Sequence, residues 1–460
     1  MLNNSSFKAN LVRGGAWAFA GKIVTVLVGL LLNALLARLL SPEEMGVYFL
    51  IFSVAMFTAI FSQLGLNNTI VRLVAESMGT NRPSRARYSV ALVLKIVVVS
   101  ALLVACFLTF GMGQWIAEAL FHSTIMGRVM GLVAIWVVVM TLQQLIAEIF
   151  RGFHDIRQAT IFGGLITSVF SMVFFGVLWL THTKGELDQI LIITLSSGLI
   201  SVLISGVVLW DKLSKLPLTV CKTLQPTDVI TERKISVANI FRISWPLWIT
   251  NLTVFVLVQA DFLIMGFFGS SEDIAIYGAA SRTVALVAIP LLIVNAVIAP
   301  VIAEMYAQGN NKKLERILRF MASISTIFSL CVFAAFAIFG GKILGMLFGG
   351  YYQAGWFILV ILSVGQVVNV WGGASGLVLM LTGHQMTMMV ISLVSGLVTI
   401  VAALLLVRGF QGFGVAMASA GGVVMQNLLM LFFTKKQIGI WTMADFSVMG
   451  DKSVWKQLIR

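Results

Sequence analysis

The stretch "SPEEMGVY" at residues 41–48 returns as "SSEDIAIY" at residues 270–277, an offset of 229 positions. In both copies a serine and two acidic residues lead into an apolar run that carries a tyrosine at the same place. Further pairs match at nearly the same offset, namely Glu76 with Glu304 and His154 with His384. Shared order and spacing predict an internal repeat of about 230 residues rather than chance likeness between membrane loops.

The composition places most of this chain in lipid. Of its 460 residues, 59% are hydrophobic and 11% are charged, whereas a soluble domain has about 25% charged residues. A helix that crosses a bilayer needs about 20 apolar residues. The apolar runs are continuous rather than alternating, which excludes a membrane barrel. They predict twelve spanning helices, at residues 14–37, 45–66, 88–110, 125–147, 158–180, 189–210, 245–268, 276–302, 318–340, 356–381, 387–408 and 412–433.

The ends of the chain and its cysteines suggest no processing or redox chemistry. The first apolar run has spanning length and no small-residue cleavage site, so we expect it to remain in the mature protein. The three cysteines, Cys106, Cys221 and Cys331, show no CxxC or CxxH spacing. We interpret them as packing residues and expect neither a metal site nor a disulfide.

The excess of Lys and Arg residues is explained by a preferred orientation of the chain in the membrane. The net charge of +13 would suggest nucleic acid in a soluble protein. With the N terminus inside, 23 of the 31 Lys and Arg residues fall in inside segments. The outside loops carry Arg38, Arg128, Lys184, Lys342 and Arg408. The positive-inside rule therefore predicts that both ends are cytoplasmic, and we expect no nucleic-acid partner.

The repeat and the helix count together predict the domain plan. Six helices in each copy give both copies the same orientation, so we expect two lobes related by an axis along the membrane normal. The expected parts are an N-lobe at 1–210, a cytoplasmic connector at 211–241, a C-lobe at 242–433 and a cytoplasmic amphipathic tail at 434–460. The fold class is thus an all-α integral membrane protein with two six-helix repeats around a central cavity, as in alternating-access transporters.

Four charged residues lie well inside predicted helices, away from the helix ends, where a charge is costly unless it meets water or a partner. They are Lys22, Lys95, Asp261 and Arg282. Lys95 has the alternative of snorkelling to the interface. Asp261 and Arg282 lie equally far from position 271.5, the centre of the loop predicted between their helices, so we expect them at one height as an ion pair. The pair either fixes the two helices in register, or holds Arg282 toward the cavity with Asp261 as a coupling group.

Cations at two depths suit an anionic substrate, because a phosphate-like group can pass from Lys22 to Arg282, with Lys95 as a third candidate. Polar residues in the helices could line the cavity and bind sugar hydroxyls, although hydrogen bonds between helices are their commoner role. The candidates are Asn33, Ser53, Gln63, Asn251, Gln259, Asn295 and Asn369, with Gln143, Gln144 and Gln366 nearby. Glu148 and Glu304 lie near helix ends, which we interpret as solvated interfacial positions.

Motifs of soluble enzymes are missing from the sequence. It contains no HExxH, no Walker A motif and no dinucleotide-binding glycine loop. The stretch "GGAWAFAGK" at 14–22 has the wrong spacing for a phosphate loop, and Ile23 stands where Ser or Thr is needed. We expect no catalytic residue and no cofactor. A coupling ion, H⁺ or Na⁺, or the membrane potential remains as the source of energy.

Four segments resemble a known family. They are "NALLARLLSPEEMGVY" (33–48), "LGLNNTIVRLVAE" (64–76), "QADFLIMGFFGSSEDIAIYGAASR" (259–282) and "VLMLTGHQ" (378–385). These segments are similar to polysaccharide flippases of the Wzx type, which belong to the superfamily of multidrug, oligosaccharidyl-lipid and polysaccharide exporters. The resemblance extends from about residue 10 to residue 435.

The resemblance implies a function and a set of partners. It implies alternating access that moves an undecaprenyl-diphosphate-linked oligosaccharide, an O-antigen, capsule or exopolysaccharide unit, between leaflets of the bacterial cytoplasmic membrane. Membrane lipids and other polysaccharide-assembly membrane proteins are the further partners that it implies. Related flippases carry cavity cations on helices one and eight, which Lys22 and Arg282 match. The helix-two cation of the peptidoglycan-precursor branch has no counterpart, because Ser53 stands at the aligned position.

Two other functions compete with this one. A multidrug cation antiporter of the same superfamily would need acidic groups in the membrane, and Asp261 is the one acid placed deep in a predicted helix. A membrane glycosyltransferase or polymerase would need an extracytoplasmic catalytic loop. The longest predicted outside loop has about 14 residues, near 111–124.

Overall fold

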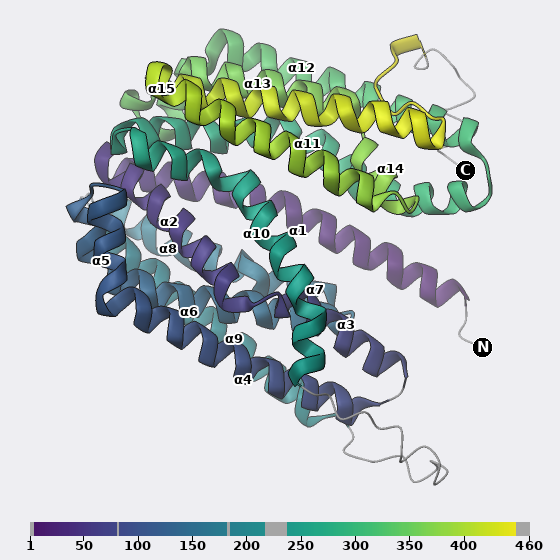
Figure 1. Ribbon diagram of the computed structural model, residues 1–460, viewed down its shortest axis with the longest axis horizontal. Helices are drawn as coiled ribbons and strands as arrows, with labels where there is room; N and C mark the ends of the chain where they lie inside the picture. Colours follow the sequence, from purple (N-terminus) through teal and green to yellow (C-terminus); the bar gives the residue numbers. More distant parts are fainter. Residues whose placement is uncertain (1–3, 81, 182–184, 217–236, 448–460) are drawn as a thin grey trace. The chain divides into compact units, whose positions relative to one another are not determined.

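The computed structural model describes residues 4–80, 82–181, 185–216 and 237–447, and every regular element among them is a helix (Figure 1). For residues 4–20, 22, 111, 239, 253, 254, 256–258, 296 and 300 it describes the backbone alone. Cys221 and most of the predicted connector and tail lie outside the described residues. The prediction of an all-α fold is confirmed.

The described helices account for the predicted spans. Nine are long and apolar enough to cross a membrane, and shorter apolar segments lie at Ile23–Leu39 and Gln259–Phe268. α15 (Gln385–Ile438) breaks at Gln411, where φ is 46°, and therefore holds two of the predicted spans. The twelve expected segments are all present, with ends up to ten residues from the predicted ones.

The chain divides into two compact units. The first holds residues 1–40 and 47–259, and the second holds residues 41–46 and 260–460. The boundary between the long segments of the two units falls inside α10 (Val237–Phe268), after Gln259. The sequence predicts a C-lobe that begins earlier, at residue 242.

The first unit has a core of packed helices. Its buried apolar residues come mainly from α3, α4 and α6, which contact one another, while α9 packs against α6 and adds Leu209. Phe150 of α6 is fully buried there beside Ile70 of α3. The elements of this unit are α1 (Asn4–Leu39), α2 (Pro42–Gln63), α3 (Leu66–Gly79), α4 (Pro83–Phe107), η1 (Leu108–Met112), α5 (Gly113–Trp115), η2 (Ile116–Leu120), α6 (Thr124–Gly152), α7 (Ile156–Thr160), η3 (Ile161–Leu165), α8 (Ile166–Leu180), α9 (Leu187–Ser214) and the first part of α10.

Helix α3 (Leu66–Gly79) lies between two predicted spans and is not among the twelve predicted helices. It follows a break at Leu64 and Gly65, both with positive φ. A Cβ atom on Gly65 would lie 2.2 Å from the carbonyl oxygen of Ser244 and 2.7 Å from the backbone nitrogen of Trp248. Glycine therefore allows both the left-handed turn and the close approach of α10. The turn places Asn67 at the start of α3, beside α10.

The second unit has its own core. Residues of α11, α12, α14 and α15 bury one another there, with Ile302, Leu314, Val378 and Leu379 almost inaccessible. The remaining elements of this unit are the end of α10, α11 (Ser271–Ala307), α12 (Asn311–Phe348), η5 (Gly350–Gly355), α13 (Trp356–Gly372), α14 (Ser375–Leu381) and α15.

The repeated serine and acidic residues cap two helix starts, as a reciprocal capping box in the first copy and as a serine N-cap in the second. The hydroxyl of Ser41 accepts from the backbone N–H of Glu44 at 3.3 Å, and the Glu44 carboxylate accepts from the backbone N–H of Ser41 at 3.0 Å. At the start of α11 the hydroxyl of Ser270 accepts from the N–H of Asp273 at 3.1 Å and donates to its carboxylate at 2.9 Å. Such contacts satisfy donors that a helix start leaves unpaired. The repeated motif therefore starts a helix twice.

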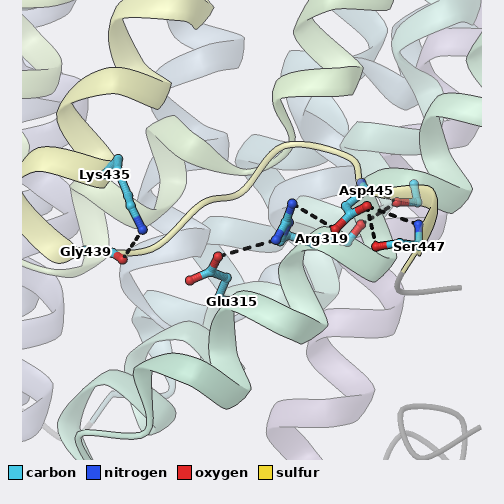
Figure 2. A network of polar contacts seen from close by, with 7 residues as sticks. Glu315, Arg319, Lys435, Gly439, Asp445 and Ser447 are labelled. Carbon is cyan, nitrogen blue, oxygen red and sulfur yellow. Dashed lines mark hydrogen bonds and ion pairs between the residues drawn. The ribbon is translucent and has the colours of Figure 1, made fainter. Parts of the chain in front are cut away.

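A strap formed by residues 439–447 is tied to the second unit after α15 (Figure 2). The N–H of Ala444 donates to the carbonyl of Trp371 at 2.8 Å, and the Thr442 hydroxyl donates to that of Gly372 at 2.8 Å. Both carbonyls belong to the last turn of α13, which breaks before α14. The strap therefore satisfies acceptors that the helix end leaves free.

An ionic contact holds the far end of this strap. Arg319 of α12 pairs with Asp445 at 2.9 Å and with Glu315 at 3.6 Å (Figure 2). Asp445 also accepts from the hydroxyl and the backbone N–H of Ser447. These hydrogen bonds, and then the charge of Arg319, hold the pKa of Asp445 below its usual value. The contribution of the Asp445 carboxylate is therefore complete above the ordinary aspartate pKa of about 3.9 and is lost as the pH falls through the lower folded-state value.

We expect Asp445→Asn to loosen the strap at neutral pH. Loss of about 1 kcal/mol from a partly exposed ion pair should speed amide hydrogen exchange of residues 440–447 about fivefold. As the pH falls through the lowered folded-state pKa of Asp445, the wild type and the variant should converge, because the native carboxylate then also loses its charge. Asp211→Asn, which removes the carboxylate that pairs with exposed Lys215, is the control. Equal exchange of Asp445→Asn and wild type at pH 7 would show that the ion pair does not hold the strap.

Candidate functional site

A carboxylate with two hydroxyl partners lies in the second unit. Asp261 of α10 accepts hydrogen bonds from the hydroxyls of Tyr277 in α11 and Ser419 in α15, both at 2.5 Å. Tyr277 is 1% exposed and packs edge-on against the Phe262 ring. The tyrosine of the second copy of the repeated motif therefore donates a hydrogen bond directly to this carboxylate. We call Asp261, Tyr277 and Ser419 the acid cluster.

The expected ion pair between Asp261 and Arg282 is wrong. Among the described residues the carboxylate takes hydroxyl donors and does not pair with Arg282. The reason is the position of the turn: α10 ends at Phe268 and α11 begins at Ser271, so the centre lies near 269.5 instead of 271.5. This shift sets Tyr277 beside Asp261 and leaves Arg282 about 7.5 Å further along α11.

The predicted cations lie in different surroundings. The guanidinium carbon of half-buried Arg282 lies 5.9 Å from the centre of the Phe262 ring. Lys95 is exposed on α4, on a face it shares with Tyr88 and Leu102, which are more than half exposed. That face suits snorkelling along lipid better than a cavity. The side chain of Lys22 lies outside the described residues.

Amide side chains surround a pocket in the first unit. The pocket has a volume of about 310 Å³ and is formed by α2, α3, α6 and α10. Three of the predicted cavity residues, Gln63, Asn251 and Gln259, line it. The described lining residues are Met56, Ile60, Gln63, Asn67, Asn68, Gln144, Glu148, Asn251, Phe255 and Gln259. We call this the amide pocket.

Several amides of the pocket hydrogen-bond to one another across helices. Gln63 donates to Gln144 at 2.6 Å, and Asn68 donates to Asn251 at 3.3 Å. These bonds tie α2 to α6 and α3 to α10. Amide groups both donate and accept, so the same atoms can exchange partners with a ligand that carries hydroxyls.

Ser53 and Gln259 connect α2 to α10 at the same site. Ser53, which is 1% exposed, donates to the backbone of Phe49 at 3.0 Å and to the Gln259 side chain at 3.4 Å. The amide nitrogen of Gln259 lies 3.7 Å from the sulfur of Met56. Ser53 thus positions a lining amide without lining the pocket itself.

The other predicted polar residues lie elsewhere. Asn33 donates to the carbonyl of Gly29 within its own helix at 2.7 Å, and Asn369 donates to Gln366 at 3.0 Å. Asn295 of α11 is half-buried, and its side-chain oxygen has no partner among the described residues. The amide pocket therefore gathers part of the predicted set, and Asn295 and Asn369 belong to the second unit.

Comparison with a family model decides the relationship. Residues 11–306 match the model described as polysaccharide biosynthesis protein. The chain belongs to that family. Like the amide pocket, the matched region includes α2, α3, α6 and α10.

Individual relatives agree with this membership. The chain is 22% identical over 437 residues to a probable low-salt glycan biosynthesis flippase, Agl15 of Haloferax volcanii, covering 92% of this chain and 85% of the relative. An inward-facing multidrug resistance transporter of the MATE family and MOP superfamily has a similar fold, with a TM-score of 0.71, 17% identity and coverage of 93% and 96%. The lipid II flippase MurJ in an inward closed conformation also has a similar fold, with a TM-score of 0.68 and 12% identity. The match covers 91% of this chain and 87% of the MurJ chain. These likenesses show that the chain shares the fold of the two solved transporters, and they agree with its membership of the polysaccharide biosynthesis family.

Part of the amide pocket lies outside the predicted set. Asn67 and Asn68 are not among the predicted candidates, because the apolar run predicts a helix that ends at residue 66. The signal was available: buried Leu66, Ile70 and Leu73 recur at helical spacing after a glycine. Glu148 was interpreted as an interfacial residue, but it lines the pocket with 20% of its side chain exposed and pairs with Arg151 at 2.5 Å.

Proposed function

We propose that this chain flips an undecaprenyl-diphosphate-linked oligosaccharide from the inner to the outer leaflet of the bacterial cytoplasmic membrane by alternating access. In this proposal both termini face the cytoplasm. The observation that carries it is the amide pocket, a site lined largely by amide side chains among the apolar helices of a member of a polysaccharide biosynthesis family. Such a site has the hydrogen-bonding groups that a glycan needs and that an apolar lipid does not.

Basic residues fit the lipid-diphosphate part of this substrate. Lys22 and Arg282 are the cations proposed to bind the diphosphate, since phosphate oxygens accept strong charge-assisted hydrogen bonds. The cation–π contact with Phe262 favours a fixed position for the guanidinium of Arg282. Lys95 remains a weaker candidate because it lies on an exposed apolar face.

The acid cluster is the proposed site of energy coupling. Asp261 is a carboxylate inside α10 whose described partners are neutral hydroxyls rather than a cation. It can therefore gain or release a coupling ion without breaking a fixed ion pair. Its contacts join three helices, so a change in its charge would reach α10, α11 and α15 together.

The function is tested by the exposure of a lipid-linked oligosaccharide in proteoliposomes. The labelled substrate is placed in the inner leaflet, and its sugar is detected by a lectin that cannot cross the membrane. We expect wild type to expose the sugar, and Lys22→Ala and Arg282→Ala each to slow exposure about tenfold, as loss of a charge-assisted contact predicts. Lys342→Ala, which removes an exposed cation, is the control.

The outcomes separate the parts of the proposal. Normal rates in both Lys22→Ala and Arg282→Ala would remove the role of the two cations. No exposure by wild type above empty liposomes would remove the function itself.

A further inference from the structure

A row of aromatic rings adjoins the amide pocket. Phe255 lines the pocket, and its ring centre lies 5.4 Å from that of Phe57. Phe57 lies 5.7 Å from Phe61, Phe61 lies 4.9 Å from Trp248, and Trp248 lies 5.3 Å from Trp245. Phe57 and Phe61 lie on α2, and the other three rings lie on α10, so the row joins the two helices. We call them the aromatic row.

The aromatic row runs from a buried end to an exposed end. Phe255 is 4% exposed, Phe61 is 41% exposed and Trp245 is 59% exposed. The ten residues from Trp245 to Phe255 span about 15 Å along α10. A tryptophan belt at the membrane interface would explain Trp245. It would not explain why the row continues through Phe57 to the lining of a polar pocket.

Aromatic rings beside amides suit one class of ligand. A sugar ring has apolar C–H faces, which pack on aromatic rings, and hydroxyl or acetamido groups at its edge, which exchange hydrogen bonds with amides. The pocket volume of about 310 Å³ lies at the lower end of the range for ligand pockets, about 300–1,000 Å³. It offers room for a sugar residue of a longer glycan.

Unpaired polar atoms indicate that a partner is missing from the pocket. Asn67 is 8% exposed and lines the pocket, yet its side-chain oxygen has no hydrogen-bond partner among the described residues. The indole nitrogen of Trp248 in the aromatic row is likewise buried without a partner there. Buried polar atoms are rarely left unpaired, so a hydroxyl-bearing ligand is a natural donor for Asn67.

The charge of the lining disfavours an acidic sugar. Glu148 is the one charged residue among the described lining residues, and its described cationic partner is Arg151. A sugar carboxylate that entered the pocket would lie near the Glu148 carboxylate, and no cation among the described lining residues could pair with it. Burying a charge without a counter-charge is unfavourable. The lining thus matches an uncharged sugar.

We propose that the amide pocket and the aromatic row bind an uncharged sugar that carries acetamido and hydroxyl groups, and that they discriminate against uronic acids. This inference rests on the proposed function, because the sugar is taken to be part of the lipid-linked oligosaccharide. It assigns the glycan to the first unit and leaves the diphosphate to the cations.

Binding by the purified full chain in detergent tests this assignment without any flipping. The probes are chitotriose, a neutral trimer of N-acetylglucosamine, and trigalacturonate, its acidic counterpart, and the readout is saturation-transfer NMR. We expect saturable binding of chitotriose and at least about tenfold weaker binding of trigalacturonate. Asn67→Leu and Phe61→Leu should each weaken chitotriose binding about tenfold, since one removes the unpaired acceptor and the other a stacking ring.

A matched variant and a second readout separate the outcomes. Gln426→Leu removes an amide that pairs with Ser392 in the second unit and should bind chitotriose like wild type. Equal binding of both trisaccharides, no binding of chitotriose, or unchanged binding in both pocket variants would overturn the inference. Flipping by wild type in that case would leave the proposed function standing, whereas absent flipping with selective binding would remove the function alone.

Discussion

Gly46→Ala should destabilise the second unit by about 3 kcal/mol, because it forces a methyl group into packed backbone. A Cβ atom at Gly46 would lie 1.7 Å from the carbonyl oxygen of Ser271 and 2.5 Å from its carbon. The obstacle is main chain at the start of α11, so no side chain can rotate away. Alanine would otherwise favour a helix by about 1 kcal/mol over glycine, which is too little to offset such a clash. The measurement is the temperature at which half of the purified protein remains folded in detergent.

Gly131→Ala is the matched control for this prediction. Gly131 lies inside α6 with nothing within 4 Å of an added Cβ. There the substitution should be neutral or stabilising by about 0.5–1 kcal/mol. The two variants therefore differ in sign, and a Gly46→Ala protein as stable as wild type would show that α2 and α11 do not meet as closely as described. The repeat has Ala275 at the position aligned with Gly46, another small buried residue.

Asp261→Asn should abolish the response of flipping to an ion gradient while the protein stays folded. Asparagine keeps a side chain of the same shape beside Tyr277 and Ser419 but cannot bind or release a proton. In proteoliposomes with an imposed H⁺ or Na⁺ gradient, we expect wild type to flip at least about tenfold faster than without the gradient. The variant should show the same slow rate under both conditions. A tenfold change in rate corresponds to about 1.4 kcal/mol of activation free energy.

Two further variants distinguish coupling from a structural role. Asp188→Asn changes an acid in the first turn of α9 and should respond to the gradient like wild type. Tyr277→Phe keeps the carboxylate and removes a donor, so it should shift the ion dependence without abolishing it. A gradient response in Asp261→Asn equal to that of wild type would assign the acid cluster to helix packing.

The helical fold could be predicted from apolar run length, because each span needs an uninterrupted apolar stretch in lipid. Helix ends were less predictable: α12 extends to Phe348 through Gly340 and Gly341, which composition alone favours as a break. α3 was not predicted because it is amphipathic and shorter than the apolar run that a spanning helix needs. The two helix caps were visible as S-x-x-E and S-x-x-D patterns, and recognising them would have placed the turn before Ser271 correctly.

The candidate site was predictable in its residue types and less so in its pairings. Gln63, Asn251 and Gln259 were selected because polar residues in spans are unusual, and they converge on the amide pocket. The partner of Asp261 was missed because a two-residue error in the centre of the turn displaces the residue expected opposite it by four positions, about 6 Å along α11. Sequence cannot show such a contact until the helix ends are known. The role of Lys22 as a cavity cation stays a prediction, because its side chain lies outside the described residues.

The central claim is that the chain moves a lipid-linked oligosaccharide rather than a cationic drug. The most direct measurement uses one preparation of wild-type proteoliposomes, with the labelled lipid-linked oligosaccharide in one sample and ethidium in the other. We predict exposure of the oligosaccharide many times faster than in empty liposomes, together with no ethidium transport above the same background. Ethidium transport without oligosaccharide exposure would contradict this account and indicate a cation antiporter on the same fold.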